Sequence, residues 1–441
     1  MASTLKEKYN SLKTNRLNKI LVIVLRIVVG ATFIFSGFVK VIDVTGSVYK
    51  FQEYIAALNV PVLAGSELVL AFAVSIIELV LGVMLLTGCL RRTTPLLLLL
   101  MMCVMLPLTF FLATTGAVPD CGCFGDAVKL TNWQTFWKNV ALTVALLYLL
   151  FFNRSVPCVY GPIIQWIVMV LTFLVGFQIA FTGYNIQPLI DFRPYKVGSH
   201  IGSQLKPVGE DDFVFIYEKD GKQQEFSLDS VPDEEDGWTF IDRKKITPEL
   251  SPAQKAEINA FTVLDNGVDV TEEVLDSTGR QLLILIPDLP KVNRAYAFTL
   301  NDISKACAEQ EVTLSCITSS SSEDVEKWND LTQAEYPFYG GDDSEIKMLA
   351  RGNPAVVYVE NGVIKWKRTF SSFPAPKLIS EKPNFKPTPL SKISDDFDPK
   401  AKLWGILWPY VLIMIALLFV NRIYPVINYI TNKIKSSRNK E

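Results

Sequence analysis

Six hydrophobic runs along the chain are long enough to cross a bilayer. Each has about 20 mainly apolar residues, the length at which an α-helix spans roughly 30 Å of hydrocarbon. The pattern predicts a polytopic α-helical membrane protein with helices at residues 20–42, 66–88, 94–114, 133–152, 162–182 and 403–420.

The segment 184–402 has the pattern of a water-soluble α/β fold. Short apolar runs predict strands, and longer amphipathic stretches predict helices. The Asn361-Gly362 pair predicts a tight hairpin turn. The proline-rich stretch 371–402 predicts an extended tether to the last helix. The strands are expected at 213–217, 281–286, 312–318, 355–359 and 363–366, and the helices at 294–310 and 323–333.

Within 251–370, this order of strands and helices resembles a thioredoxin-like fold. The resemblance implies that Pro354 occupies the position of that fold's cis-proline. A catalytic thioredoxin carries Cys-x-x-Cys after the first central strand, but residues 287–293 contain no cysteine. We therefore expect a binding module, or a partner domain that presents clients. Cys307 and Cys316 are expected to be core thiols or a buried structural bridge rather than a redox pair.

Composition and charge narrow the class of protein. The 441 residues are 49% hydrophobic and carry a net charge of −2, and no basic stripe suggests nucleic-acid binding. Lys and Arg cluster in both terminal tails, at Arg91-Arg92 and at Arg154. The positive-inside rule then predicts cytoplasmic termini in a bacterial inner membrane. Loops 43–65 and 115–132 and the segment 184–402 are expected on the extracytoplasmic side, and no removable signal peptide is expected.

Arg26, Lys40 and Glu78 fall inside predicted transmembrane helices, where charged side chains are costly and usually have partners. Depth along the two antiparallel helices places Arg26 within reach of Glu78, and Lys40 at the outer mouth. One interpretation is a structural Arg26–Glu78 ion pair, with Lys40 extending to the interface. The other is a polar membrane pocket for a small redox carrier or a proton path.

The first four helices resemble the DoxX superfamily. The resemblance rests on Arg26, Ser36-Gly37, Lys40 and Glu78 over about residues 17–152. The string Cys121-Gly122-Cys123-Phe124-Gly125 is similar to the MauE-like branch, which implies a redox-associated membrane protein that works with a thioredoxin-like partner. We expect six segments: a DoxX/MauE-like domain (1–160), a fifth transmembrane helix (161–183), a β-rich element (184–250), a thioredoxin-like domain (251–370), a tether (371–402) and a sixth helix with a basic tail (403–441).

The seven cysteines are distinguished by position. Cys103 lies within a span, while Cys89 and Cys158 lie at cytoplasmic helix ends, so these three are expected to be packing residues. Cys121 and Cys123 flank a glycine in an extracytoplasmic loop, where a small strained bridge can form. The sequence allows three interpretations of this pair: thiol-disulfide exchange, an inert structural bridge, or metal binding. A four-ligand zinc site is the least favoured, because the chain has one histidine, His200.

The leading hypothesis is an envelope redox protein in which Cys121 and Cys123 oxidise a client dithiol. A quinone is the expected electron carrier, and lipid and thiol clients are the expected partners. The alternative is a non-enzymatic scaffold or accessory subunit of an envelope complex, with residues 251–370 as a binding module.

Overall fold

The structure is a computed structural model that describes residues 15–201, 213–219, 222–226, 239–245, 261–275, 278–379 and 385–438. The chain divides into two compact units. The membrane unit combines Met1–Arg193 with Asp395–Glu441, and the sheet unit is Pro194–Ser394.

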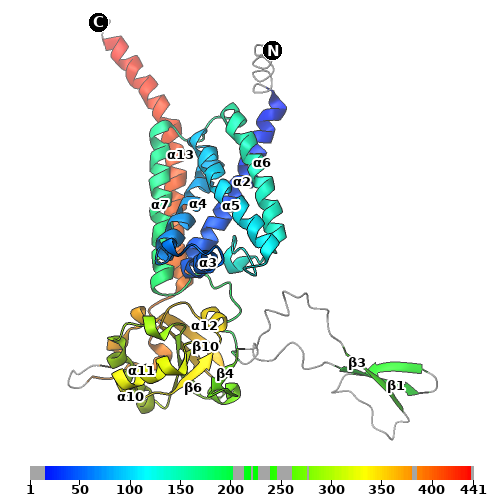
Figure 1. Cartoon of the computed structure of the whole chain (residues 1–441). Helices are drawn as coiled ribbons and strands as arrows, with labels where there is room; N and C mark the ends of the chain where they lie inside the picture. Colours follow the sequence, from blue (N-terminus) through cyan, green and yellow to red (C-terminus); the bar gives the residue numbers. More distant parts are fainter. Residues whose placement is uncertain are drawn as a thin grey trace. The chain divides into compact units, whose positions relative to one another are not determined.

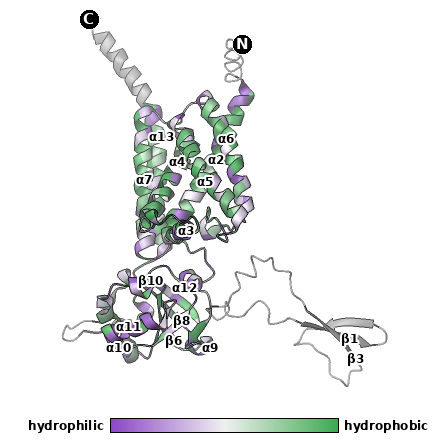
Figure 2. Cartoon of the chain, in the orientation of Figure 1, coloured by the Kyte–Doolittle hydropathy of each residue, from purple (hydrophilic) through white to green (hydrophobic). Residues whose placement is uncertain are grey.

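Among the described residues of the membrane unit, six helices are long and apolar enough to cross a membrane, in agreement with the six predicted helices. Figure 2 shows that hydrophobic residues dominate these helices along the bundle. In the bundle, α2 packs on α4, α5 on α6, and α7 on both α4 and α13 (Figure 1). The helices are α2 (Arg16–Ile42), α4 (Glu67–Thr87), α5 (Thr93–Thr115), α6 (Asn132–Phe152), α7 (Pro162–Asn185) and α13 (Pro399–Arg438).

Two glycines set the register between α2 and α4. A Cβ on Gly37 would lie 2.4 Å from the backbone nitrogen of Leu79, and one on Gly82 would lie 2.6 Å from that of Ile34. The two backbones therefore touch, as small residues allow in membrane helix pairs. This contact fixes which side chains of the two antiparallel helices lie at the same depth.

The predicted loop 43–65 contains a further helix, α3 (Val44–Ala57). The Asp43 side chain caps it by accepting a hydrogen bond from the Gly46 backbone nitrogen at 2.9 Å. The start of the helix, with Thr45, Gly46 and Ser47, has low helix propensity, so the sequence pattern hid it. The short 3-10 helices η1 (Pro61–Leu63), η2 (Gly125–Ala127) and η3 (Asn153–Ser155) lie in the other connections.

A seven-stranded mixed sheet, in the order β10-β9-β6-β7-β8-β4-β5, forms the centre of the sheet unit. Strands β6, β7 and β8 are parallel, whereas β9 runs antiparallel to β6 and β10 antiparallel to β9. Positive φ angles at Asn361 and Gly362 confirm the predicted β9–β10 turn. The strands are β4 (Val263–Asp265), β5 (Val268–Asp269), β6 (Arg280–Ile286), β7 (Thr313–Thr318), β8 (Phe338–Gly341), β9 (Ala355–Glu360) and β10 (Val363–Thr369).

Both faces of this sheet pack against a hydrophobic core. Successive side chains of one strand point to opposite faces and so belong to different cores. In β6, Leu282 and Ile284 face a core shared with α10 (Tyr296–Glu309) and α11 (Ser322–Thr332). Leu283 and Leu285 face the other core, which includes α9 (Thr271–Val274) and α12 (Asp343–Leu349). This two-sided burial explains why β6 is an unbroken apolar run in the sequence.

The proline-rich stretch is not the extended tether that the sequence predicts. Phe373, Leu378, Leu390 and Ile393 are buried in the same core as α10. Leu390 begins the 3-10 helix η10 (Leu390–Lys392), and the other three residues directly follow η8 (Phe370–Ser372), η9 (Ala375–Lys377) and η10. The prolines interrupt regular secondary structure, but the apolar residues between them bury enough surface to hold the segment on the sheet.

Within residues 184–250, where the sequence predicts a β-rich element, the described strands form an antiparallel sheet of order β2-β1-β3. Its strands are β1 (Phe213–Lys219), β2 (Lys222–Phe226) and β3 (Thr239–Lys245).

Candidate functional site

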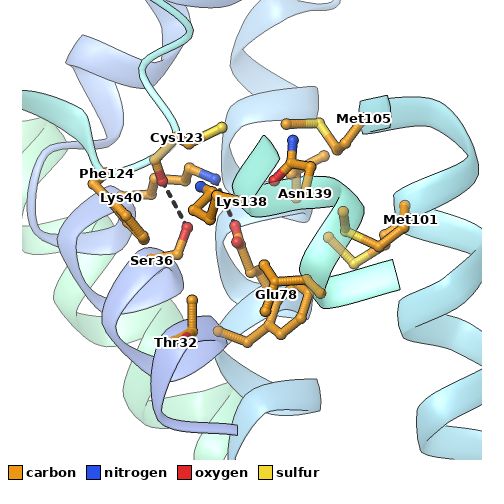
Figure 3. Close-up of a pocket in the computed structure, with 14 residues that line it drawn as sticks. Thr32, Ser36, Lys40, Glu78, Met101, Met105, Cys123, Phe124, Lys138 and Asn139 are labelled. Carbon is orange, nitrogen blue, oxygen red and sulfur yellow. Dashed lines mark hydrogen bonds and ion pairs between the residues drawn. The ribbon is translucent and has the colours of Figure 1, made fainter. Parts of the chain in front are cut away.

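A small pocket, lined by apolar side chains and a few charged and polar ones, lies inside the membrane unit, among α2, α4, α5, α6 and the loop with the two cysteines. Figure 3 shows Lys40, Glu78, Lys138, Asn139 and Cys123 gathered around it. The space open to water is about 30 Å³, room for roughly two water molecules. Thr32, Phe33, Ser36, Val74, Met101, Met102, Met105, Phe124 and Leu142 complete the lining.

Lys40 and Glu78 form a buried ion pair in this pocket, with Nζ and Oε2 2.6 Å apart. Their side chains are only 12% and 7% exposed, so solvent screens the pair weakly. The α2–α4 register explains the contact, since Gly37 packs on Leu79 one turn from Lys40 and one residue from Glu78. Lys40 and Glu78 therefore both line the pocket, and Lys40, not Arg26, is the partner of Glu78.

The expected Arg26–Glu78 ion pair is wrong. The Arg26 guanidinium instead donates to Asn153 Oδ1, at a short distance, and to the carbonyl oxygens of Asn153, Val156 and Pro157 at 2.6, 3.0 and 3.2 Å. These acceptors lie in the connection between α6 and α7. Arg26 therefore closes the end of the bundle opposite Lys40 and does not line the pocket.

The loop between α5 and α6 brings the two predicted site cysteines together. The Sγ atoms of Cys121 and Cys123 lie 3.0 Å apart, about 1 Å beyond disulfide bonding distance. Gly122 makes the bend with a φ of 59°, in the left-handed region that favours glycine. Its backbone nitrogen donates to Asp120 Oδ1 at 2.8 Å, which tightens the turn.

Two helices hold this loop in place. The Ser36 hydroxyl on α2 donates to the Cys123 carbonyl oxygen at 2.6 Å. From α3, the Tyr54 hydroxyl donates to the Cys121 carbonyl oxygen, and Lys50 forms an ion pair with Asp120 at 3.4 Å. The loop is therefore fixed at both cysteines by neighbours far away in the sequence.

The two thiols have different environments. A hydrogen bond from Cys121 and the nearby charges of Lys138 and Lys40 lower the pKa of Cys123 to about 6, although burial acts in the opposite direction. The same hydrogen bond and burial raise the pKa of Cys121. Cys123 is therefore the thiolate of the pair at neutral pH, and Cys121 keeps its proton.

The sequence patterns assign no site role to four residues that contribute to this site. Ser36 and Tyr54 bind the loop, while Lys138 and Asn139 line the pocket. Lys138 also places its ammonium 4.1 Å from the centre of the Phe124 ring. Its position near the start of an apolar helix was an available signal, but Tyr54 lies in the helix that the pattern missed.

The remaining predicted residues lie in the sheet unit. Cys307 on α10 and Cys316 on β7 are both buried free thiols in one core, and burial raises the pKa of both. The Asn353–Pro354 peptide bond is cis. His200 pairs with Val363 through a backbone bridge. Among the described residues, no three His, Cys, Asp or Glu side chains are grouped as a metal site would need.

Comparison with known proteins connects this site to one family. Residues 18–152 match the family model of the methylamine utilisation protein MauE, and residues 212–247 match a domain of unknown function (DUF8463). No curated protein and no solved structure matches the chain. The first match includes both loop cysteines, Lys40 and Glu78, so the part of the chain that holds the site is similar to the membrane protein MauE.

Proposed function

We propose that the chain exchanges disulfides with client proteins through Cys121 and Cys123. The observation that carries this proposal is the pair itself: two sulfurs 3.0 Å apart on a fixed turn, one of them beside two lysines. A thiolate is the reactive species in disulfide exchange, and cationic neighbours raise its fraction.

The unequal thiols give the exchange a direction of attack. The thiol with the lower pKa leaves faster, so a client thiolate attacks the sulfur of Cys121 and Cys123 departs as the thiolate. The second thiolate of the client then attacks the client sulfur of the mixed disulfide. This step releases Cys121, which takes up a proton. The client loses two electrons and gains a disulfide, and the Cys121–Cys123 bridge becomes a thiol and a thiolate.

The proposed exchange with clients does not depend on a quinone. Lys40 and Lys138 hold negative charge on Cys123, while Glu78 balances Lys40 in the apolar surroundings.

For the sheet unit we propose a thioredoxin-like binding module on the extracytoplasmic side. The order β10-β9-β6-β7 and the helices α10 and α11 support the fold assignment. The 3-10 helix η7 (Leu289–Lys291) follows β6 where a catalytic thioredoxin has its cysteines, which supports binding rather than redox chemistry. The Lys and Arg distribution supports the orientation in a bacterial inner membrane.

The second candidate function is an accessory subunit of an envelope complex. It is favoured by the burial of both cysteines, since the residue Cys121 is 3% exposed and Cys123 7%. A client reaches Cys121 only after the contacts of Tyr54 and Lys50 with the loop open. A purely structural loop would need no such opening.

Alkylation trapping in graded thiol redox buffers distinguishes the two functions. We expect the purified protein to interconvert between a Cys121–Cys123 bridge and two alkylatable thiols, at a potential above the roughly −300 mV of structural disulfides. Cys121→Ser and Cys123→Ser should abolish the transition, while Cys103→Ser serves as the matched control. A bridge that resists reduction, or thiols that never bridge, would favour the accessory subunit.

A further inference from the structure

A second pair of cysteines meets at the other end of the membrane unit. Cys89 follows α4 and Cys158 precedes α7, yet their Sγ atoms lie 3.4 Å apart. They are separated by 69 positions in the sequence, so the fold alone brings them together. The sequence pattern had assigned both to packing.

Backbone and side-chain hydrogen bonds fix this pair. The Val159 backbone nitrogen donates to the Thr87 carbonyl oxygen at 3.2 Å, which ties the two connections together. The Thr87 hydroxyl lies 3.2 Å from the sulfur of Cys89, and the Tyr160 backbone nitrogen donates to the sulfur of Cys158 at 3.4 Å. Cys89 is fully buried, whereas Cys158 is partly exposed.

Positive charge surrounds the more accessible sulfur. Arg26 and Arg91 donate to the carbonyl oxygens of Pro157 and Val156, the two residues before Cys158. The hydrogen bond between the two sulfurs, one from the Tyr160 backbone nitrogen and these two charges lower the pKa of Cys158 to about 6, although burial acts in the opposite direction. The hydrogen bond with Cys158 and burial raise the pKa of Cys89. The arginines that stabilise a thiolate also disfavour a bound metal cation.

The two cysteine pairs lie near opposite ends of α2. Arg26 marks the end of α2 near Cys158, and Lys40 marks the end near Cys123. Fourteen helical positions separate Arg26 from Lys40, about 21 Å. Direct exchange between the pairs is excluded over that distance, so the second pair needs its own reaction partner.

We propose that Cys89 and Cys158 form a second redox-active dithiol site, which reacts with the disulfide of a small thiol compound or of a thiol-disulfide protein. The Cys158 thiolate attacks one sulfur of that disulfide, and the other sulfur leaves as a thiolate and takes up a proton. Cys89 then loses its proton and attacks the sulfur of Cys158, which releases the second thiol. The site becomes a Cys89–Cys158 disulfide, and the partner gains two electrons.

The test uses the full chain in detergent with Cys121→Ser and Cys123→Ser, so that its result does not depend on the first pair. The protein is incubated in one arm with oxidised glutathione and in the other with an oxidised thioredoxin-type protein. Alkylation and peptide mass spectrometry follow, and the arm that reacts identifies the class of partner. We expect loss of two alkylatable thiols and a linked Cys89–Cys158 peptide, both reversed by a dithiol reductant, with Cys103→Ser as the matched control.

A single variant separates the roles of the two sulfurs. In Cys89→Ser, Cys158 should accumulate as a mixed disulfide with the reagent, because the resolving thiol is gone. Thermal unfolding of each variant verifies that the bundle is intact. If an intact parent keeps both thiols alkylatable at every redox ratio, or if Cys158 of Cys89→Ser forms no mixed disulfide, the proposal is wrong.

Discussion

The Lys40–Glu78 pair can be tested by removing one charge and then both. With 2.6 Å between the charged atoms, an effective dielectric constant of 20 gives an attraction of about 6 kcal/mol. Desolvation of two buried ions offsets much of it, so the net value of the pair is small. Removal of one partner leaves the other charge buried alone, which costs about 3–5 kcal/mol.

We therefore expect Lys40→Met and Glu78→Gln each to destabilise the protein strongly, and the double variant to be more stable than either single one. Thermal unfolding in detergent measures this, and the single changes should lower the midpoint by roughly 10 °C. Arg26→Met combined with Glu78→Gln is the matched control, because these residues share no contact and their effects should add. Additive effects for Lys40 and Glu78, with coupling between Arg26 and Glu78, would refute the reasoning.

Three further predictions concern packing, acidity and topology. Gly37→Ala should cost about 1–3 kcal/mol in unfolding free energy, because its Cβ would lie 2.4 Å from a backbone nitrogen of α4, whereas Gly405→Ala in open space should not. The alkylation rate of Cys123, followed by peptide mass spectrometry, should reach half its maximum near pH 6 and level off above neutral pH, since the pKa of this thiol is lowered to about 6; Cys121→Ser should move that midpoint upward. An Arg92→Cys probe in a cysteine-free background should resist an impermeant maleimide added outside cells, and labelling from that side would overturn the proposed orientation.

The sequence pattern predicts the elements that are long apolar runs or that have a local turn signature. The six spans and strands such as β6 are long apolar runs, and the Asn361-Gly362 turn has a local chemical signature. The hydrophobic pattern does not predict helix α3, because the first residues of this helix are small and polar. The pattern also does not predict that the proline-rich segment packs on the sheet unit, because its apolar residues bury against a core that forms only in the fold. The local sequence pattern indicates the secondary-structure propensity of a segment, whereas the structure of these two segments depends on tertiary contacts.

The partner of Glu78 was predicted wrongly for a geometric reason. Level helix ends would bring Arg26 within reach of Glu78, but Gly30 packs on Leu86 and Gly37 on Leu79. In this register, α4 ends before it reaches Arg26, and Lys40 lies near Glu78. A sequence gives the length of each helix but not the offset between neighbours, which backbone contacts at glycines decide.

The glycine contact between α2 and α4 also divides the bundle into a fixed half and an adaptable half. Two backbones in direct contact at Gly37 and Gly82 have no freedom to slide or separate without losing that packing. The opposite wall of the pocket is different: α5 contributes flexible methionines and contains Pro107, which removes one backbone hydrogen bond from the helix. Any widening of the pocket beside Cys123 should therefore come from α5 and α6, because α2 and α4 are held together and keep Lys40 and Glu78 in register.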